Sequence, residues 1–261
     1  MANQIFKRND GTYLNVEFID GDKTKPGIVY LHGLLSNMNS KKGQYLKVFA
    51  LEKGLSYLSF DFSAHGQSWG KPYDFTIGRC LKDALDILNH YVSVPQIIVG
   101  SSMGGWIGLL LCEKAPEKVA GYVGLASGAD FTKFVWNNLL NDNLRQSLKD
   151  GLILGPSEET RGYCFTYQMF QDAEQYFVLD KKINYNGPVR LLWGDKDELV
   201  PFQTTLAIKD VLTSDNTQLI LIKGGNHSLS LPEHLSIIGQ TLEGVLNQNE
   251  NIVFAKRSLE S

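Results

Sequence analysis

Short apolar runs alternate with longer segments of helical pattern along most of the chain, beginning at Gly27. Apolar runs bounded by turn residues are typical of buried strands. We expect such strands at Ile28–Leu31, Tyr57–Asp61, Gln96–Val99, Val119–Leu125, Val189–Trp193 and Gln218–Ile222. Strands that alternate with helices predict an α/β fold, with a mostly parallel sheet and helices on both of its faces.

Two other segments have a clear period. Apolar residues recur at helical spacing through Thr76–Val92, which predicts a helix that covers the sheet and carries Asp83 and Asp86 on its polar side. Side chains alternate in character through Thr12–Ile19, ahead of a glycine-containing turn. This alternation predicts an antiparallel strand at the edge of the sheet.

Residues 130–186 interrupt the alternation and are too many for an ordinary connection, because most loops in compact domains are much shorter. We predict that they form a lid inserted into a core of residues 1–129 and 187–247, followed by a loosely packed polar tail of residues 248–261. The bulky lid residues are Phe131, Phe134, Trp136, Leu139, Leu140, Tyr163, Phe165, Tyr167, Met169, Phe170, Tyr176 and Phe177. Their side chains either form the lid's own core or line an apolar pocket.

A Gly-Ser-Ser-Met-Gly sequence at residues 100–104 stands between the predicted strand Gln96–Val99 and an apolar helical run. A strand, a Gly-x-Ser-x-Gly turn and a helix make a nucleophile elbow, in which glycines flank a serine in strained backbone geometry. The central position belongs to Ser102, whereas Ser101 would point into the structure. Ser102 is therefore the candidate nucleophile.

A serine hydroxyl needs a base to remove its proton and an acid to orient that base. Where the nucleophile lies in such an elbow, the acid and then the histidine follow on loops after later strands. Asp197 lies in the loop after Val189–Trp193, and His227 lies in the loop after Gln218–Ile222. Ser102, Asp197 and His227 are the predicted catalytic triad.

Asp195 is the alternative acid, because it lies in the same loop as Asp197. We favour Asp197, since the pattern Gly-x-x-Asp-x-x-Val-Pro places the acid three residues after its glycine, here Gly194. Asp197 is also followed by Val200 and Pro201, as this pattern requires.

Two backbone N–H groups complete the predicted site as an oxyanion hole, those of Leu34 and Met103. Leu34 follows the strand Ile28–Leu31, and Met103 follows the nucleophile. Loss of one such donor typically costs about 3 kcal/mol of transition-state stabilisation. His32 stands close by, but we expect it to pack at the end of its strand and assign it no proton transfer.

The remaining histidines have structural interpretations. His65 lies in a tight turn after Tyr57–Asp61, where Asp and Ser side chains stabilise the reversal of the chain. His90 ends the predicted helix Thr76–Val92 and His234 opens the last helix, so we expect both to face solvent.

Length and charge narrow the class of protein. The 261 residues fit one large domain with a full hydrophobic core, and the net charge of −3 provides no basic face for nucleic acid. The short Lys41-Lys42 cluster is expected to be solvated surface. No apolar run reaches the roughly 18 residues of a membrane span. We therefore expect neither a nucleic-acid partner nor a transmembrane segment.

Three scattered cysteines, Cys80, Cys112 and Cys164, indicate neither a disulfide framework nor a zinc cluster. The first nine residues lack the apolar core of a signal peptide. We therefore expect a protein of the cytoplasm. The predicted triad needs no metal and no organic cofactor.

With these residues in place, the chain resembles the α/β-hydrolase superfamily from about Gly27 to Gly244. Within it, the chain is similar to the abhydrolase-domain-10 group at residues 26–39 (PGIVYLHGLLSNMN), 60–63 (FDFS), 99–106 (VGSSMGGW), 115–119 and 191–201. The resemblance implies the α/β-hydrolase fold. It also assigns the nucleophile, acid and base to Ser102, Asp197 and His227.

The animal member of that group is a mitochondrial serine hydrolase that removes palmitoyl groups from protein cysteines and cleaves acyl glucuronides. The resemblance thus implies hydrolysis of an ester or thioester with a hydrophobic acyl chain, on a small molecule or an S-acylated protein, through an acyl-enzyme. A general carboxylesterase, a carbon–carbon bond hydrolase using the same triad, and a non-catalytic ligand receptor are the alternatives.

The chain departs from the superfamily pattern in two places. Ala64 stands where the superfamily often has glycine, which alters a turn without touching the chemistry. The chain also begins without an arginine-rich amphipathic transit segment, so mitochondrial targeting does not follow from the resemblance.

Overall fold

An eight-stranded sheet forms the centre of the computed structural model, which describes residues 4–155, 157 and 162–259, the last eleven of these by backbone alone. The strand order is β1-β2-β4-β3-β5-β6-β7-β8. β2 pairs antiparallel with β1 and β4, and the other pairs are parallel. The strands are β1 (Gln4–Lys7), β2 (Tyr13–Ile19), β3 (Ile28–Leu31), β4 (Tyr57–Phe60), β5 (Gln96–Ser101), β6 (Val119–Leu125), β7 (Val189–Gly194) and β8 (Thr217–Ile222).

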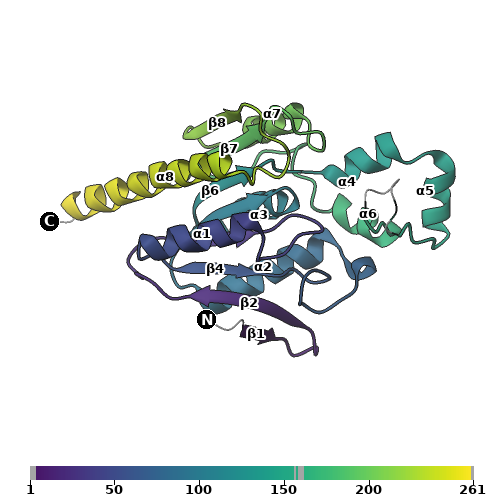
Figure 1. Cartoon of the computed structure of the whole chain (residues 1–261), viewed down its shortest axis with the longest axis horizontal. Coiled ribbons are helices and arrows are strands. Elements are labelled where there is room, and N and C mark those ends of the chain that lie inside the picture. Colours follow the sequence, from purple (N-terminus) through teal and green to yellow (C-terminus); the bar gives the residue numbers. More distant parts are fainter. Residues whose placement is uncertain (1–3, 156, 158–161, 260–261) are drawn as a thin grey trace.

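Helices cover both faces of this sheet (Figure 1). They are α1 (Lys41–Glu52), α2 (Ile77–Tyr91), α3 (Met103–Lys114), α4 (Phe131–Phe134), α5 (Asp142–Lys149), α6 (Tyr167–Glu174), α7 (Phe202–Val211) and α8 (Pro232–Leu259). Three short helices join them: η1 (Pro72–Asp74), η2 (Pro116–Lys118) and the π-helix η3 (Val135–Leu139). The predicted α/β architecture is confirmed.

Strand β3 shows why the central strands read as continuous apolar runs. Side chains of a strand point alternately to its two faces. Ile28 and Tyr30 join the core under α1 and α8, whereas Val29 and Leu31 join the core under α2 and α3. Because both faces are covered, no position along the strand is left for a polar side chain.

The predicted strands all form, with ends that differ from the prediction by at most two residues. The predicted edge position of the segment 12–19 is wrong, because β1 pairs with the outer side of β2. β1 has only four residues, and most of its side chains are exposed. Because β1 is short and buries no face, its sequence lacks the alternation of apolar and polar residues that would predict a strand.

Asp83 of α2 is fully buried rather than solvated on a polar face. Arg8, which follows β1, donates to Asp83 at 2.7 Å and to Asp86 at 2.7 Å. The backbone N–H of Ser63 also donates to Asp83 at 2.7 Å. Burial raises the pKa of Asp83, and these donors act in the opposite direction. The polar side of α2 is thus covered by the amino-terminal segment, which sequence periodicity does not place.

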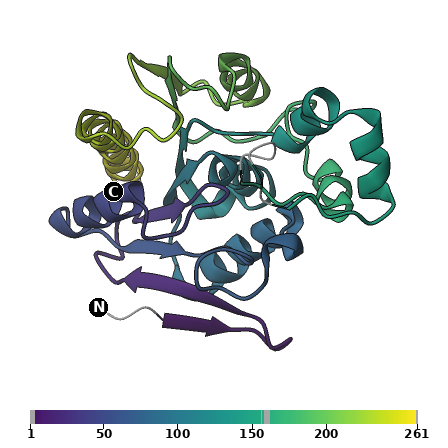
Figure 2. The same ribbon diagram turned by 45° about the vertical axis from the view of Figure 1, so that its right-hand side comes forward.

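The segment between β6 and β7 contains α4, η3, α5 and α6, which project from one end of the sheet (Figures 1 and 2). Trp136 packs on Phe170 with ring centroids 4.9 Å apart, and Phe165 and Met169 are buried beside them. Many of the bulky residues therefore form a core of the segment itself. Leu139 is exposed.

Helix α8 runs beyond the sheet and ends at the left of Figure 1. Residues 248–259, predicted from the sequence as part of a polar tail, continue it as helix. Each residue added to an existing helix fixes one backbone unit for one hydrogen bond, so extension is easier than nucleation. The loose packing of the tail stays a prediction, as do the boundaries of the lid.

Two side chains expected to face solvent are buried: Lys42 is 7% exposed and His234 is 3% exposed. Both belong to first turns of helices that lie side by side. Lys53, directly after α1, pairs with Glu243 of α8. Lys42 reaches the loop that precedes α8, where it donates to the carbonyl of Ser228. His90, by contrast, is exposed as predicted.

Asp61, directly after β4, ties three segments together. Its carboxylate accepts hydrogen bonds from Asn15 Nδ2, Met38 N and Gln67 N, each at 2.9 Å. The turn that follows has Ala64 at a φ of +65°, a region in which glycine is less strained. This conformation accounts for the frequent glycine at that position in the superfamily.

Replacing Asp61 by asparagine should lower the free energy of unfolding by about 1–3 kcal/mol, because an amide NH₂ would face buried donors. Urea unfolding followed by far-ultraviolet circular dichroism measures the change. The matched control is Asp20→Asn, whose carboxylate is 55% exposed and pairs with Lys23 at the surface. That change should be within about 0.5 kcal/mol of zero. Equal losses for the two variants would contradict the assignment.

Candidate active site

Ser102 lies at the junction of β5 and α3 with φ +54° and ψ −118°, a strained conformation for a residue with a side chain. The flanking glycines are required by contact. A Cβ on Gly100 would lie 2.3 Å from the carbonyl oxygen of Gly104, and a Cβ on Gly104 would lie 2.1 Å from that of Leu31. The predicted nucleophile elbow is therefore present in the fold.

Backbone hydrogen bonds to β6 and the loop after it hold Ser102 in this conformation. The N–H of Ser102 donates to Leu125 O at 2.9 Å. Its carbonyl accepts from Gly105 N at 2.9 Å and from Gly128 N at 3.0 Å. The strain is thus balanced by bonds on both sides of the serine, and the side chain projects from a fixed backbone.

The structure brings the three predicted triad residues together. Nε2 of His227 lies 3.0 Å from Ser102 Oγ. Nδ1 of His227 lies 2.9 Å from Asp197 Oδ2 and 3.1 Å from Oδ1. The side chain of Asp197 is fully buried and that of His227 is 22% exposed. A histidine so placed can take the serine proton while the carboxylate fixes the ring and stabilises its cation.

Of the two candidate acids, only Asp197 reaches the histidine. Its Oδ1 also accepts from the N–H groups of Leu199 at 2.9 Å and Val200 at 3.0 Å, which fix the carboxylate. Asp195 is exposed and accepts instead from Gly224 N at 2.6 Å, in the loop that leads to His227. The geometry thus supports Asp197 as the acid beside His227. Asp195 instead helps to hold the loop that leads to His227.

The predicted oxyanion-hole residues lie beside the serine. A Cβ on Gly33 would be 3.1 Å from Ser102 Cβ, so the loop carrying Leu34 passes directly by the nucleophile. Met103 is the first residue of α3, and its N–H has no partner within the helix. Within the described residues, neither the Leu34 nor the Met103 N–H donates a hydrogen bond to the protein. Both are therefore available to a developing oxyanion.

His32 is buried, as predicted, and supports this loop. Burial, and to a lesser extent the neighbouring His65, lower its pKa to about 3, and only a hydrogen bond to Gly33 O opposes the shift. The neutral ring then donates from Nδ1 to Gly33 O at 2.8 Å and accepts at Nε2 from Phe62 N at 3.1 Å. Both ring nitrogens are occupied, which agrees with assigning His32 no proton transfer.

A run of aromatic contacts links the elbow to the inserted helices. Trp106, one turn after the nucleophile, lies edge-on to Phe131 and stacks on Phe177, with centroids 5.7 and 6.2 Å apart. Its Nε1 donates to Tyr176 O at 3.0 Å. Phe177 also lines a hollow of about 590 Å³ among these helices, together with Thr132, Lys133, Trp136, Asn137, Lys149, Tyr167, Phe170 and Glu174.

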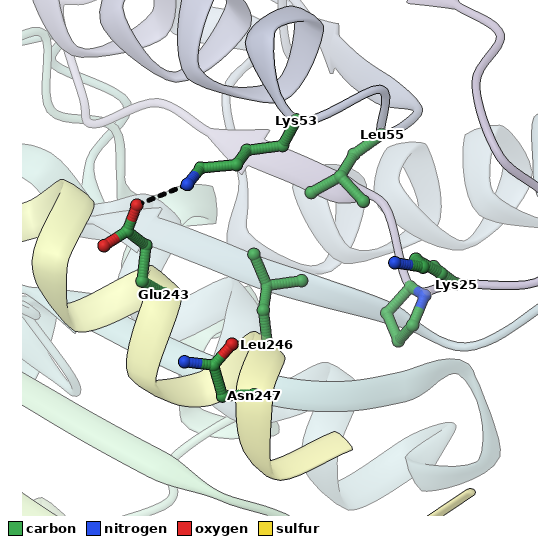
Figure 3. A pocket seen from close by; sticks show the side chains of 7 residues that line it. Lys25, Lys53, Leu55, Glu243, Leu246 and Asn247 are labelled. Carbon is green, nitrogen blue, oxygen red and sulfur yellow. Dashed lines mark hydrogen bonds and ion pairs between the residues drawn. The ribbon is translucent and has the colours of Figure 1, made fainter. Parts of the chain in front are cut away.

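A smaller hollow of about 110 Å³ lies between α8 and the carboxyl end of α1 (Figure 3). An ion pair joins two of its lining residues, Lys53 and Glu243. No triad residue lines this hollow. It is a packing gap beside the long helix, remote from the chemistry of Ser102.

Two residues near the site were not assigned roles from the sequence. Asp61 holds Met38 in the loop that follows Leu34. Lys42 donates to the carbonyl of Ser228, next to His227. The position of Asp61 after a strand was a signal that could have been followed. Nothing in the sequence distinguishes Lys42 from the adjacent Lys41, which is exposed.

In the part of the chain that the structure describes, no three His, Cys, Asp or Glu side chains gather closely enough to hold a metal ion. No helix in that part combines the length and the apolar character that crossing a membrane requires.

Comparison with known proteins places this geometry in a family. The profile of the alpha/beta hydrolase fold matches residues 26–152. Mouse palmitoyl-protein thioesterase ABHD10, a mitochondrial protein, is 34% identical over 230 residues, which are 87% of this chain and 77% of the relative. The chain therefore belongs to the α/β-hydrolase family, and its prediction as an enzyme of that fold is confirmed.

Solved structures agree with this assignment. Mouse alpha/beta hydrolase domain-containing protein 10 superposes with a TM-score of 0.87 at 29% identity, covering 95% of this chain and 99% of that one. A putative hydrolase from Agrobacterium vitis S4 gives a TM-score of 0.86 at 28% identity, covering 94% and 98%. The resemblance read from the sequence motifs to the abhydrolase-domain-10 group is thereby confirmed.

The two loop aspartates differ in geometry, so their variants should differ in activity. Asp197→Asn should lower kcat by roughly 10³–10⁴-fold, because the amide no longer stabilises the histidine cation. Asp195→Asn should lose far less, since it affects His227 only through the loop backbone. Steady-state hydrolysis of a p-nitrophenyl ester measures both. An equal or larger loss for Asp195→Asn would contradict the assignment of the acid.

Proposed function

We propose that this protein is a serine hydrolase that cleaves an ester or thioester with a hydrophobic acyl chain through an acyl-enzyme. The observation that carries the proposal is the continuous path from the Asp197 carboxylate through the His227 ring to the Ser102 hydroxyl. That path ends on a strained elbow between β5 and α3. Two free N–H groups beside it suit a tetrahedral intermediate.

In the first half-reaction, His227 Nε2 accepts the proton of Ser102 as Oγ attacks the carbonyl carbon of the substrate. The oxyanion accepts hydrogen bonds from Leu34 N–H and Met103 N–H, and Asp197 stabilises the imidazolium. Collapse of the intermediate breaks the bond to the leaving alkoxide or thiolate, which takes the proton from His227. The acyl group remains on Ser102 as an ester.

In the second half-reaction, His227 removes a proton from water while the water oxygen attacks the acyl carbon. Collapse of this second intermediate returns the proton to Ser102 Oγ and releases a carboxylic acid. All proton transfers pass through one nitrogen, His227 Nε2.

Two observations favour a hydrophobic acyl chain and a thioester. The mouse relative is named a palmitoyl-protein thioesterase, which supports a long acyl group on a cysteine of a protein. The helices between β6 and β7 present aromatic side chains that continue from Trp106 at the elbow. We propose that this segment is the lid and that it receives the acyl chain, since apolar walls favour burial of CH₂ groups.

Replacing Ser102 by alanine should reduce turnover by at least roughly a thousandfold, because the nucleophile is lost. The measurement is hydrolysis of p-nitrophenyl esters and acyl thioesters of increasing chain length. Ser101→Ala, one residue away, is the matched control and should keep most of the activity. Equal turnover by wild type and Ser102→Ala would contradict the proposed mechanism.

The dependence on the acyl group tests the substrate. Serine-dependent turnover that rises with chain length and favours thioesters would support the proposal. Preference for short oxygen esters would replace it by a general carboxylesterase. Labelling of Ser102 by a fluorophosphonate without turnover of any ester would point to carbon–carbon bond hydrolysis, and absence of both would leave a ligand receptor.

A further inference from the structure

Lys42 is a buried cation close to the candidate site that the mechanism does not use. It is the second residue of α1, and it is 7% exposed. Its Nζ donates to the backbone carbonyl of Ser228 and lies 3.5 Å from Ser230 Oγ. The preceding residue, Lys41, is exposed. Of two adjacent lysines in the same turn of α1, one is thus exposed to solvent and the other is buried.

The position of Lys42 is unfavourable for stability. In the part of the chain that the structure describes, no carboxylate pairs with it, and burial lowers its pKa to about 8. It also stands at the amino-terminal, positive end of a helix. A buried ammonium without a counter-ion is normally replaced by an apolar side chain at no loss of stability. Stability therefore does not explain this lysine.

The carbonyl that Lys42 contacts belongs to the loop of the candidate base. Ser228 directly follows His227, and its N–H and hydroxyl both donate to Asn226 Oδ1, at 3.2 and 2.9 Å. The next residue, Leu229, has a φ of +44°, so the loop turns tightly here. Because the turn is rigid, holding the Ser228 carbonyl also holds the backbone from which the histidine ring projects.

The other end of the contact is Lys42 itself, in the helix that follows the loop of the predicted oxyanion hole. Helix α1 follows the loop that carries Leu34 and Gly33. That loop is held on its far side by the bond from Met38 N to Asp61. The Lys42 side chain therefore joins the segment that supplies an oxyanion donor to the segment that supplies the base, although 186 residues separate its two ends.

We infer that Lys42 is a positioning residue, which holds the Ser228 carbonyl and thereby keeps His227 Nε2 on Ser102 Oγ. This inference rests on the proposed function, because it assigns Lys42 a part in the activity of that triad. A merely structural lysine would lower stability and activity together when replaced. A positioning lysine lowers activity while stability is kept or raised.

The experiment compares Lys42→Met with Lys41→Met, using p-nitrophenyl butyrate hydrolysis and thermal unfolding. Lys42→Met should lower kcat by about 10–10²-fold with little change in KM, since a misplacement of about 1 Å can cost that much. Its midpoint of thermal unfolding should not fall below that of wild type. Lys41→Met should match wild type in both.

The orientation of the histidine can be followed directly. The downfield proton resonance of the His227 Nδ1–H bonded to Asp197 should shift or broaden in Lys42→Met and stay in place in Lys41→Met. A kcat within twofold of wild type with an unchanged resonance would overturn the inference. So would a fall in kcat that matches a lower folded fraction.

A second pair of variants covers the case in which Lys42→Met does not fold. Arginine keeps the charge and the length at this position, whereas glutamine is too short to reach the carbonyl. Lys42→Arg should retain more of the wild-type kcat than Lys42→Gln. Equal kcat values for these two variants would overturn the inference.

Failure of the proposed function has a different signature. If a fluorophosphonate does not label Ser102 in the wild type, and Ser102→Ala hydrolyses the ester as fast as wild type, the triad is not the machinery. If the wild type is labelled and Lys42→Met is labelled at the same rate, the triad stands and the role of Lys42 is wrong.

Discussion

The site depends on one steric constraint, the close approach of chains around Ser102. A serine at positive φ between β5 and α3 leaves no room for a Cβ at Gly100 or Gly104, where neighbouring carbonyl oxygens lie little more than 2 Å from the place it would occupy. Those oxygens belong to α3 and to the end of β3. The elbow therefore fixes how closely the start of α3 packs against the ends of β3 and β5.

Parallel strands then determine where the partners of the serine can stand. The carboxyl ends of β3, β5, β7 and β8 lie along the same edge of the sheet, so the loops that follow them converge. Leu34, Ser102, Asp197 and His227 each belong to one of these loops. Four short segments from distant parts of the sequence thus contribute one group each, at the edge of a sheet that helices cover on both faces.

Prediction from the sequence succeeded where a local pattern carries the information. Apolar runs placed the strands and the Gly-x-Ser-x-Gly spacing placed the elbow, since each depends on residues near in sequence. The Gly-x-x-Asp spacing favours Asp197, which lies against His227, and its role as the acid stays a prediction. Lys42, Asp83 and His234 were assigned to the surface, because what buries them is a segment far away in the chain. The cytoplasmic location stays a prediction.

The link between Lys42 and Ser228 has a consequence for how the protein acquires its activity. Its ends are 186 residues apart, and those of the bond between Ser102 and His227 are 125 apart. Contacts between such distant residues close large loops, which local helices and hairpins do not require. On the ribosome, therefore, β1 to β7 and the helices between them can form before the groups of the proposed triad meet. The proposed triad is completed only when β8 has paired with β7 and the loop after β8 has brought His227 to Ser102.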